Sequence, residues 1–124
     1  MTERLNLLVL EESDVDFSAL DRYLRNERAD CQVERVTSVA GLSDATARPW
    51  DAVLLGWPLA GVQLGSLPNL IERYFPETPA LLLAGQVGEE RVADLLMAGI
   101  NGYVNKEGLG RLLPAIRSAL RDAA

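Results

Sequence analysis

The sequence predicts one α/β domain in which helices cover both faces of a five-stranded parallel sheet. Short apolar runs alternate five times with segments of helical period, a pattern typical of parallel sheets. The central runs are almost entirely apolar, as expected for strands buried on both faces. The chain has 124 residues, of which 48% are apolar and 24% charged, and these values fit a single globular domain.

The first predicted unit is a buried strand followed by a long helix. Residues 5–10 form a nearly continuous apolar run, which favours a strand covered on both faces. A helix is predicted from about Val15, because Phe17, Leu20 and Leu24 recur at spacings of three and four.

The next unit is shorter and more polar. Residues 31–36 suit an edge strand. Ser38 is placed to cap a short helix that ends before Pro49. Residues 51–55 then form the third strand, and Gly56 follows it directly.

The second half repeats the pattern with a helix over 67–74, a strand over 79–84, a helix after Gly88, a strand over 101–104 and a last helix over 109–120. Two acids follow Gly88, where the helix dipole favours negative charge. The residues of this fourth helix that are predicted to face inward are Val92, Leu95 and Leu96.

The predicted strand order is 2-1-3-4-5, with the polar second and fifth strands at the edges. Function in such sheets sits at the carboxyl ends of the strands. The residues predicted to meet there are Glu11, Glu12, Gly56, Ala84 and Lys106.

Composition excludes several classes of function. The chain has no histidine, which removes the usual proton shuttle, the Ser–His and Cys–His nucleophile pairs and the commonest metal ligand. We therefore predict that it is not an enzyme.

The net charge of -6 argues against binding to nucleic acid or to an anionic membrane. No apolar stretch approaches the ~20 residues of a membrane span, and the single cysteine, Cys31, fits a cytoplasmic location.

The strand-end residues resemble, in chain order, those of two-component response-regulator receiver (CheY-like) domains. That family has two acids after the first strand, an acceptor aspartate after the third, a Ser or Thr after the fourth and a lysine after the fifth. Its aspartate takes phosphate from a kinase histidine with the help of Mg2+. Glu11 and Glu12 match the acids and Lys106, the only lysine of the chain, matches the lysine. The resemblance covers nearly the whole chain and implies a three-layer flavodoxin-like fold.

Two positions depart from the family pattern. Gly56 stands in the acceptor slot, and Ala84 stands where the hydroxyl residue would be. Asp51 cannot replace the acceptor, because five residues of strand at about 3.3 Å each place it roughly 16 Å away. The chain is therefore predicted to be a degenerate receiver that lacks its phospho-acceptor. Mg2+ binding at Glu11 and Glu12 should be weak or absent, since one of the three carboxylates is missing.

Two further expectations concern contacts of the pocket and of the surface. Without an acceptor, Lys106 should form an ion pair with Glu11 or Glu12. Tyr103 matches the family's switch aromatic and is predicted to be a packed or interface residue. In the family the fourth helix, fifth strand and fifth helix form the usual dimer and output surface. The candidates on that face are Arg91, Asp94, Tyr103, Arg111 and Arg117.

These residues predict a signalling module, independent of phosphorylation, that acts through protein partners, a fused output domain or a homodimer. Residues 1–124 are expected to be the N-terminal domain of a longer protein. One alternative is a working receiver that is phosphorylated on Glu11 or Glu12. Another is a flavodoxin-like FMN carrier, but its phosphate loop would have to coincide with the acidic segment 11–14, which would repel phosphate.

Overall fold

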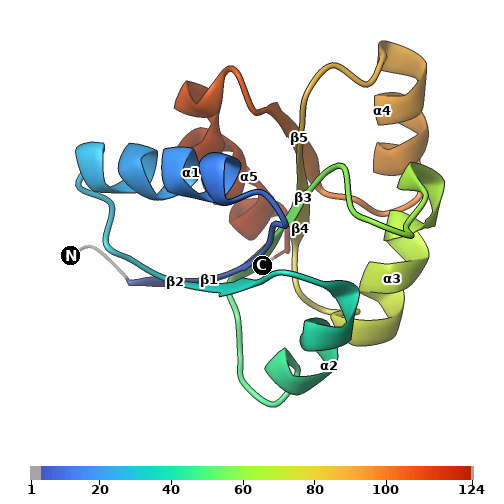
Figure 1. Ribbon diagram of the computed structural model, residues 1–124, viewed down its shortest axis with the longest axis horizontal. Coiled ribbons are helices and arrows are strands. Elements are labelled where there is room, and N and C mark those ends of the chain that lie inside the picture. The colour runs from blue at the N-terminus through green and yellow to red at the C-terminus, as the bar shows by residue number, and fades with distance from the viewer. Residues whose placement is uncertain (1–3, 124) are drawn as a thin grey trace.

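The computed structural model describes residues 4–123. Its five strands form a parallel sheet in the order β2-β1-β3-β4-β5 (Figure 1). The strands are β1 (Leu5–Leu10), β2 (Cys31–Val36), β3 (Ala52–Gly56), β4 (Ala80–Ala84) and β5 (Gly102–Asn105). The helices are α1 (Asp14–Asn26), α2 (Leu42–Ala45), α3 (Leu67–Tyr74), α4 (Glu89–Met97) and α5 (Leu112–Ala123). This is the predicted three-layer flavodoxin-like fold, and the predicted strand order is confirmed.

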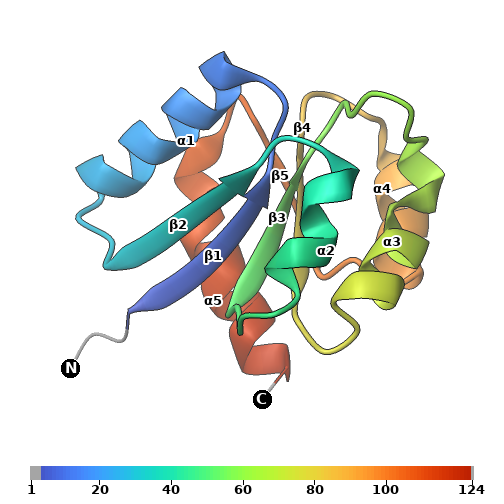
Figure 2. The same cartoon turned by 60° about the horizontal axis from the view of Figure 1, so that its bottom comes forward.

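Helices cover both faces of the sheet, so the core has two halves. Helices α1 and α5 lie on one face, and α2, α3 and α4 lie on the other (Figure 2). Strands β1, β3 and β4 supply residues to both halves, because successive side chains of a strand point to opposite faces. The three central strands are therefore apolar except near their ends, whereas the edge strand β2 also carries polar side chains along its length.

Helix α1 begins one residue earlier than predicted, because Ser13 caps it. The Ser13 hydroxyl accepts a hydrogen bond from the Asp16 backbone N–H at 3.1 Å, and Asp14 and Asp16 occupy the first turn. The predicted cap at Ser38 is wrong in detail, because its side chain makes no capping hydrogen bond to the 3-10 turn over Val39–Gly41.

The orientation predicted for Leu96 is also wrong. Leu95 is buried and Val92 is half-buried, whereas 43% of Leu96 is exposed. Leu95 is the only buried residue of α4, and Leu96 and Met97, which follow it on the helix, are exposed. Helical spacing identifies an apolar stripe but not its depth of burial.

Within residues 4–123, none of the helices combines the length and the apolar character that crossing a membrane requires.

Candidate functional site at the carboxyl ends of the strands

The predicted site residues gather at one edge of the sheet. Leu10 lies beside Leu55 in the β1–β3 register, so the next residues along each strand, Glu11 and Gly56, are neighbours. On the other side, the Lys106 backbone N–H donates to the carbonyl of Ala84 at 2.9 Å.

Strand alternation decides which of these side chains meet. Leu54 and Val104 point toward α1 and α5, so Gly56 and Lys106, two residues further along each chain, take the same direction. Val9 also packs on this side of the sheet, and Glu11, two residues further along, points the same way. Glu11, Gly56 and Lys106 therefore share one pocket.

Ala84 belongs to the opposite half of the core, with α2, α3 and α4. It is fully buried, and its methyl group carries no hydrogen-bonding atom. The strand-end edge thus has two sides, and the departures from the family pattern at Gly56 and Ala84 fall one on each.

The Glu11 carboxylate occupies the space above Gly56. A Cβ atom added to Gly56 would lie 2.7 Å from Glu11 Cδ and 3.0 Å from Oε2, and closer still to Oε1. Only 3% of Glu11 is exposed, and it is the one buried charged residue within 4–123. The Glu11 carboxylate is therefore a buried charge and not a solvated acid of the loop.

Lys106 pairs with two carboxylates at once. Its Nζ lies 2.8 Å from Glu11 Oε1 and 2.8 Å from Asp16 Oδ2, and 15% of its side chain is exposed. The predicted ion pair with Glu11 is confirmed. Asp16 was not predicted as a partner of Lys106. Its carboxylate reaches Lys106 from the first turn of α1, and the sequence did not indicate that this turn lies beside the end of β5.

The second oxygen of Glu11 is bound by its own loop. The Ser13 backbone N–H donates to Glu11 Oε2 at 3.1 Å, while the Ser13 hydroxyl caps α1. One serine thus joins the buried carboxylate to the start of the helix.

Arg35 on β2 holds the same loop from the opposite side, and sequence reasoning missed it. Its Nε donates to the Glu11 carbonyl at 2.9 Å and its Nη1 lies 2.8 Å from Asp14 Oδ1. The guanidinium also lies 5.0 Å from the centre of the Phe17 ring, a cation–π distance. The sequence did offer a signal for this contact, namely an arginine on the edge strand next to an acidic loop at the end of the first strand.

Glu12 turns away from Glu11. It is exposed, and its Oε2 accepts a hydrogen bond of 2.8 Å from the Ala60 backbone N–H in the loop after β3. Within residues 4–123, no three His, Cys, Asp or Glu side chains are placed to hold a metal ion.

Tyr103 lies beside a groove between α4 and β5. Its hydroxyl donates to the Gly85 carbonyl at 2.6 Å. The groove has a volume of about 480 Å3. Its apolar lining residues are Val87, Val92, Ala93, Leu96 and Tyr103.

The opposite edge of the sheet holds residues that do not join this site. Asp51 accepts a hydrogen bond of 2.7 Å from the Asn6 backbone N–H near the start of β1, as its predicted distance from the pocket requires. Cys31, also at this edge, is half-buried. Burial and then the Asp30 charge raise the pKa of its thiol, and Arg117 opposes them.

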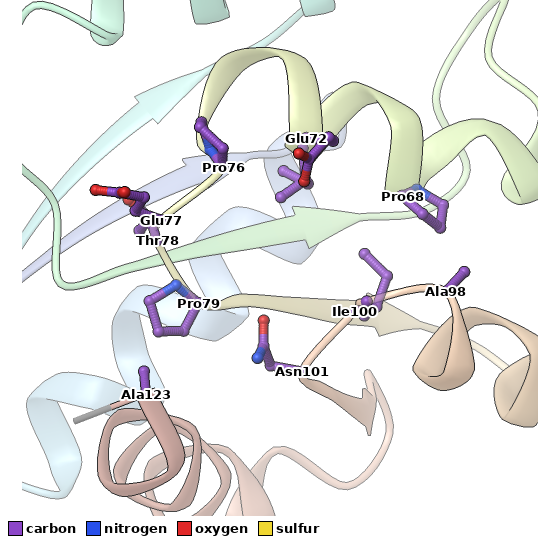
Figure 3. A pocket seen from close by; sticks show the side chains of 12 residues that line it. Pro68, Glu72, Pro76, Glu77, Thr78, Pro79, Ala98, Ile100, Asn101 and Ala123 are labelled. Atoms are coloured by element: carbon purple, nitrogen blue, oxygen red, sulfur yellow. The ribbon is translucent and has the colours of Figure 1, made fainter.

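A hollow of about 220 Å3 also lies at this opposite edge. Its lining side chains come from α3, from the segments that precede β4 and β5, and from Ala123 at the end of α5 (Figure 3). Asn101 lies in its wall, and its side-chain oxygen accepts a hydrogen bond of 2.9 Å from the Ala80 backbone N–H. This bond ties the starts of β4 and β5 together.

The fold is similar to that of solved receiver domains. The beryllofluoride-activated NtrC4 receiver domain dimer matches with a TM-score of 0.80 and 13% identity, over 96% of this chain and 98% of that one. A CheY-like receiver domain protein from Methanospirillum hungatei has a TM-score of 0.76 and 17% identity, over 98% and 97% of the two chains.

The receiver domain of a Pseudomonas aeruginosa sensor histidine kinase, solved with magnesium in its active site cleft, also has a TM-score of 0.76. It is 19% identical, over 96% of this chain and 99% of that one. No protein-family model matches the sequence, and a search of curated proteins finds no match. At these identities the comparisons establish a common fold.

Proposed function

We propose that this chain is a receiver-like signalling module of a two-component or phosphorelay system that works without being phosphorylated. The fold shared with solved receiver domains supports the signalling class. The acidic pair and the lysine at the matching strand ends support it further. Receiver domains are typically non-enzymatic, and the absence of histidine agrees with such a role.

One observation carries the proposal of phosphorylation independence. At Gly56, the position matched to the acceptor, the backbone is buried and the space for a side chain is filled by the Glu11 carboxylate. The carboxylate found there is only 3% exposed, and its two oxygens are bound by Lys106 and by the Ser13 backbone N–H, so it is not free to attack a phosphoryl donor. Ala84 adds to the case, because it offers no hydroxyl to a phosphoryl oxygen.

The surface through which the module acts is proposed to be the face of α4, β5 and α5. The apolar groove beside Tyr103 and the exposed side chains of Leu96 and Met97 support contact with a protein partner there. We propose a second copy of the chain, or an output domain of a longer protein that begins with residues 1–124. The NtrC4 structure is that of a receiver domain dimer, which supports the first of these.

Incubation with acetyl phosphate and Mg2+, followed by intact-mass measurement, tests the proposal. We expect no stable addition of a phosphoryl group to the parent protein. Glu12 is the exposed acid of the pair, so Glu12→Gln is the informative variant. An adduct in the parent that is lost in Glu12→Gln or in Glu11→Gln would show that the chain is a working receiver with a non-standard acceptor.

Calorimetric titration with Mg2+ is the second arm of this test. We expect weak or no binding, because Glu11 is committed to Lys106 and Glu12 points elsewhere, which leaves no convergent set of oxygen ligands. Submicromolar affinity would contradict the proposal.

A further inference from the structure

We propose that Glu11 is a built-in occupant of the acceptor space, and that Glu11, Gly56 and Lys106 act together as a clasp that keeps the pocket closed. A single carboxylate fills the volume over Gly56 and supplies the anion for Lys106. External oxyanions such as phosphate are thereby excluded. This inference deepens the proposed function, and it rests on that proposal for identifying the space over Gly56 as the acceptor space.

The first part of the argument is steric. The Glu11 carboxylate packs directly on Gly56, at distances that a real Cβ atom would not tolerate. Gly56 does not have a left-handed backbone conformation, unlike Gly61, Gly88 and Gly99. Its backbone would therefore accept a side chain without strain. The absence of a side chain at position 56 is required by Glu11 and not by the local turn.

The second part is electrostatic. The Lys106 ammonium lies at 2.8 Å from both Glu11 and Asp16, and its own charge is more than balanced by these two carboxylates. A buried carboxylate would be costly without such a partner. Glu11 thus depends on Lys106 for its charge and on Gly56 for its space.

The third part is connectivity. The ion pairs join the end of β1, the first turn of α1 and the end of β5. Arg35 adds β2 through the Glu11 carbonyl, and Glu12 adds the loop after β3 through Ala60. Residues 11–16 would have to move to admit a ligand. They are bonded to β2, to the loop after β3 and to the end of β5.

A double-mutant cycle between positions 56 and 11, read by urea unfolding, tests the steric part. In the parent background, Gly56→Ala should raise the unfolding equilibrium constant by roughly tenfold or more, the usual effect of overpacking. In the Glu11→Ala background the same change should be neutral or stabilising, because the new methyl group enters vacated space. Gly65→Ala is the matched control, since a Cβ atom there meets nothing within 4 Å.

The variant Glu11→Gln separates shape from charge. The amide keeps the volume of the carboxylate, so Gly56→Ala should remain as damaging as in the parent. Lys106→Met should lose most of its effect in this background, because the buried negative charge that it leaves unpaired is gone. A packing role alone would leave the cost of Lys106→Met unchanged.

Equal effects of Gly56→Ala in the parent and Glu11→Ala backgrounds, within about twofold, would overturn the clasp, because independent sites behave additively. A Gly56→Ala protein that folds only together with Glu11→Ala supports it, and one that is unfolded in both backgrounds contradicts it. The cycle measures stability alone. The clasp can therefore fail while the phosphorylation result stands, and an adduct on Glu12 would refute the proposed function without touching the cycle.

Discussion

Among single residues, Glu11 and Lys106 show how a buried ion pair depends on both partners. The side chains of Glu11 and Lys106 are 4% and 15% exposed. Removing one partner of such a pair leaves the other charge unsatisfied in a low-dielectric setting, which costs more than the pair contributes. Exposed ion pairs such as Arg4–Asp30 have no comparable penalty, because water solvates whichever charge remains.

We therefore expect Lys106→Met to lower the free energy of unfolding by about 3 kcal/mol, measured by urea denaturation monitored through the tryptophans. The matched control Arg4→Met should change it by less than about 1 kcal/mol. Similar losses for the two variants would mean that the Lys106 pair is solvated.

At the scale of elements, α4 is the helix that contributes least to the core. Of its nine residues only Leu95 is buried, while Leu96 and Met97 are exposed and the groove beside β5 is apolar. Helices α1 and α5 bury their apolar stripes against the sheet more completely. Exposed apolar patches are typical of contact surfaces, and this is the reason for proposing the interface on this side of the molecule.

Leu96→Asp should weaken self-association while leaving the urea midpoint nearly unchanged, because the side chain is already partly in water. Sedimentation velocity over a concentration series measures the effect. Val15→Asp on α1, where Val15 is 78% exposed on the other face, is the control and should not alter self-association. A parent protein that stays monomeric at the highest concentration would refute the homodimer on this face.

For the whole molecule, charge balance limits the partners. A net charge of -6 repels the phosphate backbone, and binding to duplex DNA requires several cationic contacts. Arginine makes up nearly all of the positive charge, and Arg35 and Arg48 are already paired with acids.

Fluorescence anisotropy with a short labelled duplex should accordingly show no binding by this chain at about 0.15 M salt. A basic protein on the same duplex serves as the positive control. Salt-sensitive binding by the parent chain would indicate a cationic surface that the net charge conceals.

The fold could be predicted from the sequence because its signals are local. Apolar runs of strand length and helical spacing identified each element, and the polarity of residues 31–36 and 101–104 identified the edge strands. Topology then places all carboxyl strand ends at one edge, so the meeting of Glu11, Gly56 and Lys106 followed from chain order. The bounds of α1 and the exposure of Leu96 did not follow, because they depend on capping and on depth of packing.

By itself, the sequence determined that Glu11, Gly56 and Lys106 lie at the same edge of the sheet and that position 56 contributes no side chain there. Only the tertiary structure decided that Glu11 turns inward over that glycine while Glu12 turns out to Ala60. It also added Asp16 and Arg35 as partners. The physical reason is that strand periodicity sets the side of the sheet on which a residue projects, whereas filling a buried space and pairing a buried charge depend on neighbours far apart in the chain.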